Sequence, residues 1–68
     1  MTTKEKMIAK IKAQDTERLI DISNTLILKF DDESGIVKEN VDNELNERLS
    51  DEELTKLWNH QEELLDAA

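Results

Sequence analysis

Apolar residues recur along almost the whole chain at the 3.6-residue spacing of an amphipathic helix, and no proline interrupts them. The pattern falls into four segments, which predict helices near residues 3–13, 16–30, 37–49 and 51–65. Because the breaks between them are short, we expect consecutive helices to fold back as antiparallel hairpins. The sequence therefore predicts one all-α domain over residues 1–68, a small three- to four-helix bundle with an acidic turn near 31–35.

Three of the predicted helices begin with a side chain that can accept hydrogen bonds from the free N–H groups of a first turn. Thr2 with Glu5, and Ser50 with Glu53, have the spacing of a capping box. Asp15 is a favourable N-cap residue immediately before the second helix. These local signals predict where the helices start.

The pattern is weakest around Gly35, the only glycine, which follows a run of acidic residues. Glycine suits a helix C-cap or a tight turn, so we expect the chain to reverse there. A β-hairpin is the alternative, with residues 25–30 and 36–38 as its strands. A lone two-stranded hairpin has little stability of its own, which favours a helix–turn–helix arrangement over residues 25–38.

The chain is short for an independently stable domain. With 68 residues it can bury only about 60% of the surface that its unfolded form exposes, and it has no cysteine for a disulfide. We therefore expect self-association as a two-fold dimer, or contact with another protein. The apolar side of the second predicted helix runs from Leu19 to Phe30 and includes Ser23, whereas Leu28 lies on its polar side. Trp58 is the largest apolar side chain of the chain. The candidate interface residues are Leu28, Phe30 and Trp58. Core packing is the other interpretation of Trp58, because it lies in a leucine stripe.

Charge is distributed unevenly along the chain. Residues 1–30 hold six basic and four acidic side chains, whereas residues 31–68 hold three basic and thirteen acidic ones. Because such an acidic surface repels the phosphates of nucleic acid, we expect no direct binding to nucleic acid. The last predicted helix has an acidic face made of Asp51, Glu52, Glu62, Glu63 and Asp66. An acidic decoy that mimics nucleic acid and inhibits a basic nucleic-acid-binding protein is therefore the alternative function, and a partner-induced ordering of the C-terminal half is a third.

Residues that could carry catalysis or bind a metal are scarce. His60 is the only histidine, and cysteine and tyrosine are absent. Aligning Gly35 with the invariant glycine of an EF-hand places Phe30 and Val41 at ligand positions, so that motif fails. We expect no enzyme activity, no cofactor and no metal site. No apolar run is long enough to span a membrane, and we expect a cytoplasmic protein.

The stretch from Glu47 to Leu54, with the sequence ERLSDEEL, resembles a pattern found in small accessory proteins of phages, plasmids and other mobile elements. The similarity is largely the capping box described above. It implies neither a fold nor an activity for this chain.

Overall fold

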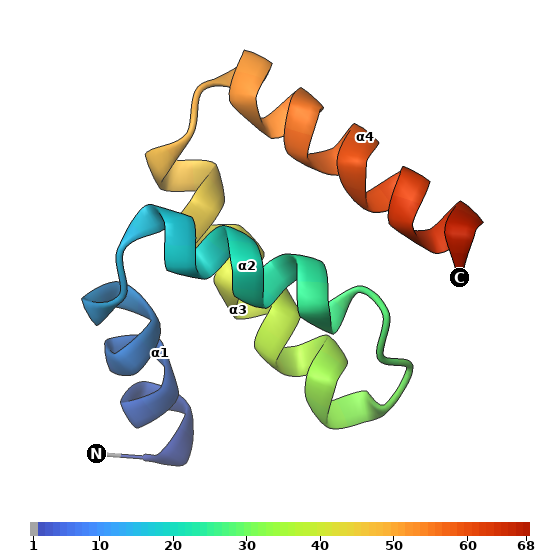
Figure 1. Ribbon diagram of the computed structural model, residues 1–68. Coiled ribbons are helices and arrows are strands. Elements are labelled where there is room, and N and C mark those ends of the chain that lie inside the picture. Colours follow the sequence, from blue (N-terminus) through green and yellow to red (C-terminus); the bar gives the residue numbers. More distant parts are fainter. Residues whose placement is uncertain (1) are drawn as a thin grey trace.

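The computed structural model describes residues 2–68, and over this range the chain forms four α-helices and no strand (Figure 1). The helices are α1 (Thr3–Ala13), α2 (Thr16–Leu26), α3 (Asp32–Arg48) and α4 (Asp51–Ala67). The all-α bundle predicted from the sequence is confirmed. The hairpin alternative for residues 25–38 is wrong, because this segment is the end of α2, a turn and the beginning of α3.

The helix starts follow the capping side chains. The Thr2 and Ser50 hydroxyls each accept the N–H of the glutamate three residues later, and that glutamate accepts the N–H of the cap residue, so both capping boxes form. The Asp15 carboxylate accepts the Arg18 N–H at 2.9 Å. These caps satisfy donors that would otherwise lack a partner in the first helical turn.

The predicted turn at 31–35 needs a correction. Asp31 is the N-cap of α3: its carboxylate accepts the Ser34 N–H at 3.1 Å and the Ser34 hydroxyl at 2.8 Å. The chain reverses earlier, at residues 27–31, and Gly35 lies inside the first turns of α3 without a positive φ. The acidic run therefore starts a helix, where the helix dipole favours negative charge.

The core is built mainly between α2 and α3. Leu19 of α2 and Val41 and Leu45 of α3 are completely buried, while Ile11 of α1 and Leu57 of α4 complete the apolar cluster. Val41 and Leu45 belong to the stripe that predicted α3 from the sequence. Most interhelix contacts join α2 to α3, and α4 packs more lightly against α2. None of the described helices is long and apolar enough to cross a membrane.

Candidate interaction surface

Among residues 2–68, four large hydrophobic side chains are exposed to solvent: Leu28 is 42% exposed, Phe30 85%, Ile36 55% and Leu65 39%. Phe30 differs most from expectation, because the sequence pattern placed it on the core-facing side of a longer second helix. Since α2 ends at Leu26, Phe30 falls in the connection to α3 and points away from the core. Burying a side chain of this kind is worth about 1.5–3 kcal/mol, so its exposure is costly for the isolated protein.

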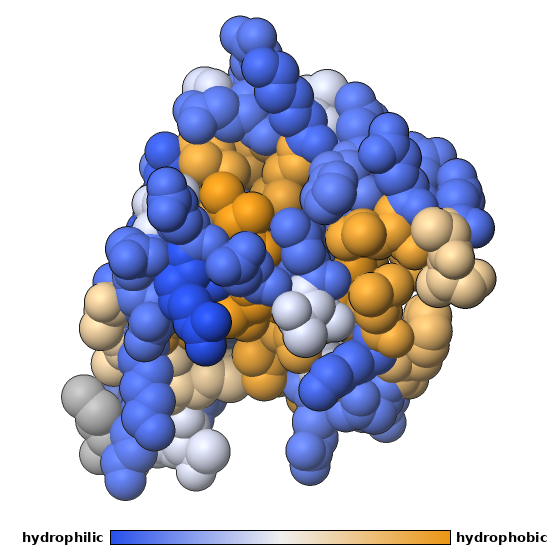
Figure 2. Space-filling model, in the orientation of Figure 1, coloured by the Kyte–Doolittle hydropathy of each residue, from blue (hydrophilic) through white to orange (hydrophobic). Residues whose placement is uncertain are grey.

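Three of these side chains belong to the same end of the bundle. Figure 1 shows α2 and α4 running in the same direction, so that both helices end near the connection between α2 and α3. The Gln61 amide donates to Ser23, 38 positions earlier, and to Asn24, 37 positions earlier. Leu65 lies one helical turn beyond Gln61, and Leu28 follows the end of α2 at Leu26, so both lie beyond this contact in the same direction along the two helices. Figure 2 shows hydrophobic surface at this end of the molecule, on the right of the view. We call Leu28, Phe30 and Leu65 the apolar end.

The sequence pointed to Leu28 and Phe30 but missed Leu65 and Ile36. A signal for both existed, because Leu65 follows Leu64 and Ile36 precedes Val37. Adjacent helical residues point about 100° apart, so one member of each pair must turn away from a narrow core. Ile36 lies over a different surface from the apolar end, in a shallow depression shared with Thr3, Lys4 and Met7 of α1.

Trp58, the third predicted interface residue, is only partly exposed and packs against the core. The ammonium group of Lys38 lies 5.3 Å from the centroid of its ring, a distance at which a cation is attracted to the aromatic face. In this arrangement the Trp58 ring is partly covered by protein. Its role as an interface residue stays a prediction.

A buried polar cluster positions α4 against the other helices. The Ser23 side chain is completely buried; its hydroxyl accepts from Gln61 at 2.8 Å and donates to the Asp42 carboxylate at 2.7 Å. Lys38 pairs with the other Asp42 oxygen at 2.6 Å. Sequence reasoning placed Ser23 on the core face but missed Gln61, which lies in the apolar stripe of α4, four residues after Leu57. Because hydrogen bonds are directional, these contacts fix the position of α4 relative to α2 and α3 more precisely than apolar contacts alone would.

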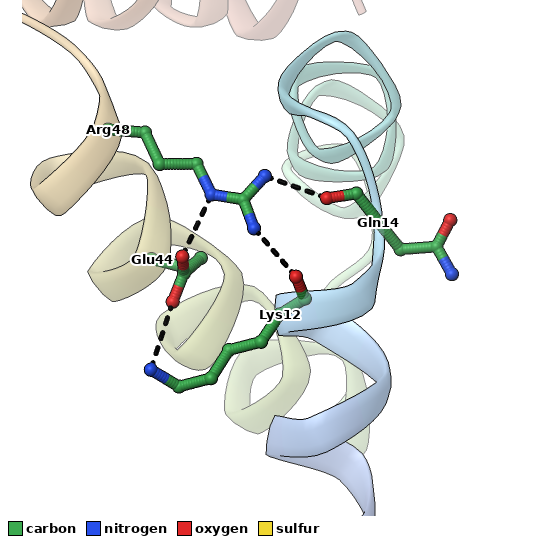
Figure 3. A network of polar contacts seen from close by, with 4 residues as sticks. All are labelled: Lys12, Gln14, Glu44 and Arg48. Atoms are coloured by element: carbon green, nitrogen blue, oxygen red, sulfur yellow. Dashed lines mark hydrogen bonds and ion pairs between the residues drawn. The ribbon is translucent and has the colours of Figure 1, made fainter.

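A second polar cluster, shown in Figure 3, ties the end of α1 to α3. The Arg48 guanidinium donates to the backbone carbonyls of Gln14 at 2.7 Å and Lys12 at 2.9 Å, and to the Glu44 carboxylate at 2.8 Å. The Arg48 bond lowers the pKa of the Glu44 carboxyl below its ordinary range, and the nearby Lys12 ammonium lowers it further. The Arg48 side chain thus joins two carbonyls at the end of α1 to a carboxylate of α3, and these contacts stabilise the packing of the two helices.

The apolar end has strongly anionic surroundings. Residues 27–33 and 62–68 contain one basic side chain, Lys29, and six acidic ones: Asp31, Asp32, Glu33, Glu62, Glu63 and Asp66. The Ser34 hydroxyl and N–H lower the pKa of the Asp31 carboxyl, which keeps it ionised. Neither α2 nor α4 has a basic residue in its last turn. The negative ends of two helix dipoles therefore add to the carboxylate charge.

The acidic face predicted on α4 is solvent-exposed at all five of its positions. Within residues 2–68, one of the five carboxylates takes part in an ion pair: Glu52 lies 3.6 Å from Lys56, and both side chains are largely in water. A pair of this kind contributes little to stability. Asp51 and Glu52 lie at the start of the helix, whereas Glu62, Glu63 and Asp66 lie at its end, beside the apolar end.

The other side chains that could bind a metal or take part in catalysis are His60, Ser34, Ser50 and the acidic residues. Among the described residues, no three histidine or acidic side chains are grouped closely enough to hold a metal ion. His60 is exposed on the rim of a shallow groove between α2 and α4, whose apolar wall includes Ile20 and Leu57. Ser34 and Ser50 donate to the carboxylates of Asp31 and Glu53. These side chains are occupied in capping helices.

Comparison with known proteins adds no relative to this description: the chain matches no protein-family model, and no similar curated protein or solved structure was found.

Proposed function

We propose that this protein is a non-enzymatic helical module that works by contact with other protein surfaces, with the apolar end as its contact site. The observation that carries the proposal is Phe30, a large aromatic side chain that is 85% exposed. Leu28 and Leu65 extend the same surface at the ends of α2 and α4. Aromatic side chains that become buried at the centre of an interface are among those that dominate its binding energy, and the residues around them exclude water.

A second copy of the chain is one candidate occupant, because the sequence predicts a two-fold dimer. A cytoplasmic location belongs to the same proposal. Light scattering after size exclusion, at protein concentrations from about 1 to 100 μM, would measure the dimer directly. Phe30→Ala should shift any dimer towards monomer, whereas Thr25→Ala, an exposed position in α2, should leave the molar mass unchanged.

The contact site is tested in the organism that makes the protein. A benzophenone-bearing analogue of phenylalanine in place of Phe30 should form light-dependent cross-links to a protein at the contact site. The same analogue in place of Glu52, on the acidic face, is the matched control because its side chain is also largely exposed. Cross-links from position 30 support the proposal, and their absence at that position contradicts it.

The acidic decoy is the second candidate function, and the exposed, mostly unpaired carboxylates of α4 are the observation that favours it. In this case the partner is a basic nucleic-acid-binding protein, and the affinity falls steeply with salt. Cross-links formed from Glu52 but not from position 30 would favour this function. DNA should compete with the chain for the cross-linked partner, and failure of that competition would count against a decoy.

A further inference from the structure

The apolar end is too small to hold two copies of this chain together without further contacts. Its centre is one phenylalanine and two half-exposed leucines, whereas stable interfaces bury about 800 Å² on each partner. An aromatic side chain contributes about 150–250 Å² to such an area. Any occupant must therefore also cover the charged surface around these three residues.

A second copy would bring like charges together at that surface. In a two-fold contact, the six acidic residues around one apolar end would face the same six residues of the other. The whole chain carries a formal charge of −8, so longer-range repulsion acts in the same direction. A partner with basic residues meets no such repulsion.

The carboxylates at the end of α4 have no compensating charge beside them in the described part of the chain. Within residues 2–68, no basic nitrogen lies within 4.0 Å of the carboxylates of Glu62, Glu63 or Asp66, and all three residues are exposed. They also lie at the negative end of the helix dipole, where a cation is favoured instead. The acidic residues at the start of α3 are Asp31, Asp32 and Glu33. Their charge is compensated in part, because Asp31 caps the helix and all three lie at the positive end of its dipole.

We propose that the occupant of the apolar end is a basic amphipathic helix of another protein. Its apolar residues would cover Leu28, Phe30 and Leu65, and its lysine or arginine side chains would pair with Glu62, Glu63 and Asp66. This inference rests on the proposed contact function and names the chemistry of the partner. It uses helix docking, in which spaced apolar anchors provide affinity and flanking charges provide orientation.

Three synthetic peptides of about 16 residues serve as probes. The first has leucine at i, i+3, i+4 and i+7 with lysine elsewhere, the second has glutamate in place of lysine, and the third has the first composition in scrambled order. Binding is measured by fluorescence anisotropy at about 20 and 150 mM salt, and located by amide chemical shifts of the ¹⁵N-labelled protein. We expect the first peptide to bind at least tenfold more tightly than the other two. Its shift changes should centre on residues 27–31 and 62–67.

Variants separate the apolar and the charged contributions. Phe30→Ala should weaken binding of the first peptide about tenfold or more, since a buried aromatic anchor is lost. The triple variant Glu62→Gln, Glu63→Gln, Asp66→Asn should weaken it at low salt and remove most of the salt dependence. The control for charge is Glu39→Gln with Glu47→Gln, which removes two exposed carboxylates of α3 and should change affinity less than threefold. All these side chains are exposed, so thermal unfolding should show intact folds.

The outcomes also separate this inference from the proposed function. Equal binding of the scrambled peptide, or shift changes centred on Asp51 and Glu52, would overturn the basic-helix inference. A Phe30-dependent dimer in light scattering that binds none of the peptides would overturn it too, while leaving the contact function in place. Absence of peptide binding together with absence of cross-links from position 30 would contradict both.

Discussion

Replacing Ser23 with alanine should loosen the attachment of α4, because the Ser23 hydroxyl is the link between Gln61 on α4 and Asp42 on α3. The side chain is completely buried, so water cannot replace the lost hydroxyl. One bond joins two neutral groups at 2.8 Å and the other ends on a carboxylate at 2.7 Å. Such bonds contribute about 0.5–1.5 and about 1.5–3 kcal/mol to stability, respectively.

Several effects reduce the loss of stability that Ser23→Ala causes. Gln61 keeps its bond to Asn24 at 3.2 Å, and Asp42 keeps Lys38 at 2.6 Å. Alanine is also the better helix former by about 0.5 kcal/mol. We therefore expect the free energy of unfolding to fall by about 2 kcal/mol, which lowers the melting temperature of a domain of this size by about 8–16 °C.

Urea unfolding, followed by Trp58 fluorescence and by circular dichroism, measures the change. Thr25→Ala is the matched control, because the Thr25 hydroxyl is exposed and bonds only to the Asp21 carbonyl of its own helix. That variant should stay within about 0.5 kcal/mol of wild type. The double variant Ser23→Ala, Gln61→Ala should lose less than the two single variants together, because both remove the same bond. A Ser23→Ala cost no larger than that of Thr25→Ala would refute the reasoning.

Three further predictions use the same unfolding assay. Leu45→Ala should cost about 2–5 kcal/mol, because a completely buried leucine leaves a cavity; a cost under about 1 kcal/mol would contradict its place in the core. Gly35→Ala should raise the free energy of unfolding by about 0.5–1 kcal/mol, because Gly35 is helical and an added methyl group meets nothing within 4 Å; a loss would show that the helix starts later. The urea midpoint of wild type should exceed that of Glu44→Gln at neutral pH. Because the pKa of Glu44 is lowered in the folded state from its ordinary value of 4.5, this difference is present at pH above that value and disappears as the pH falls through the folded value. A difference that persists at about pH 2 would contradict a charge-based role for Glu44.

Sequence alone determined where three of the helices begin and which class of fold results. Thr2, Asp15 and Ser50 bond to a backbone N–H three residues away, so their effect needs no other part of the chain. The apolar spacing of Val41 and Leu45 likewise predicted a core-facing side of α3. Such signals act within one or two helical turns, and in this fold the tertiary contacts agree with them.

Tertiary structure decided which side chains are covered. Phe30 continues an apolar pattern, yet the chain needs residues 27–31 to reverse direction, and this leaves the ring in solvent. Gln61 is polar, yet it is buried because the parallel alignment of α4 with α2 brings Ser23 and Asn24 within hydrogen-bonding distance. Both outcomes depend on residues far apart in sequence that meet only in the folded bundle. Periodicity along one segment carries no information about such partners.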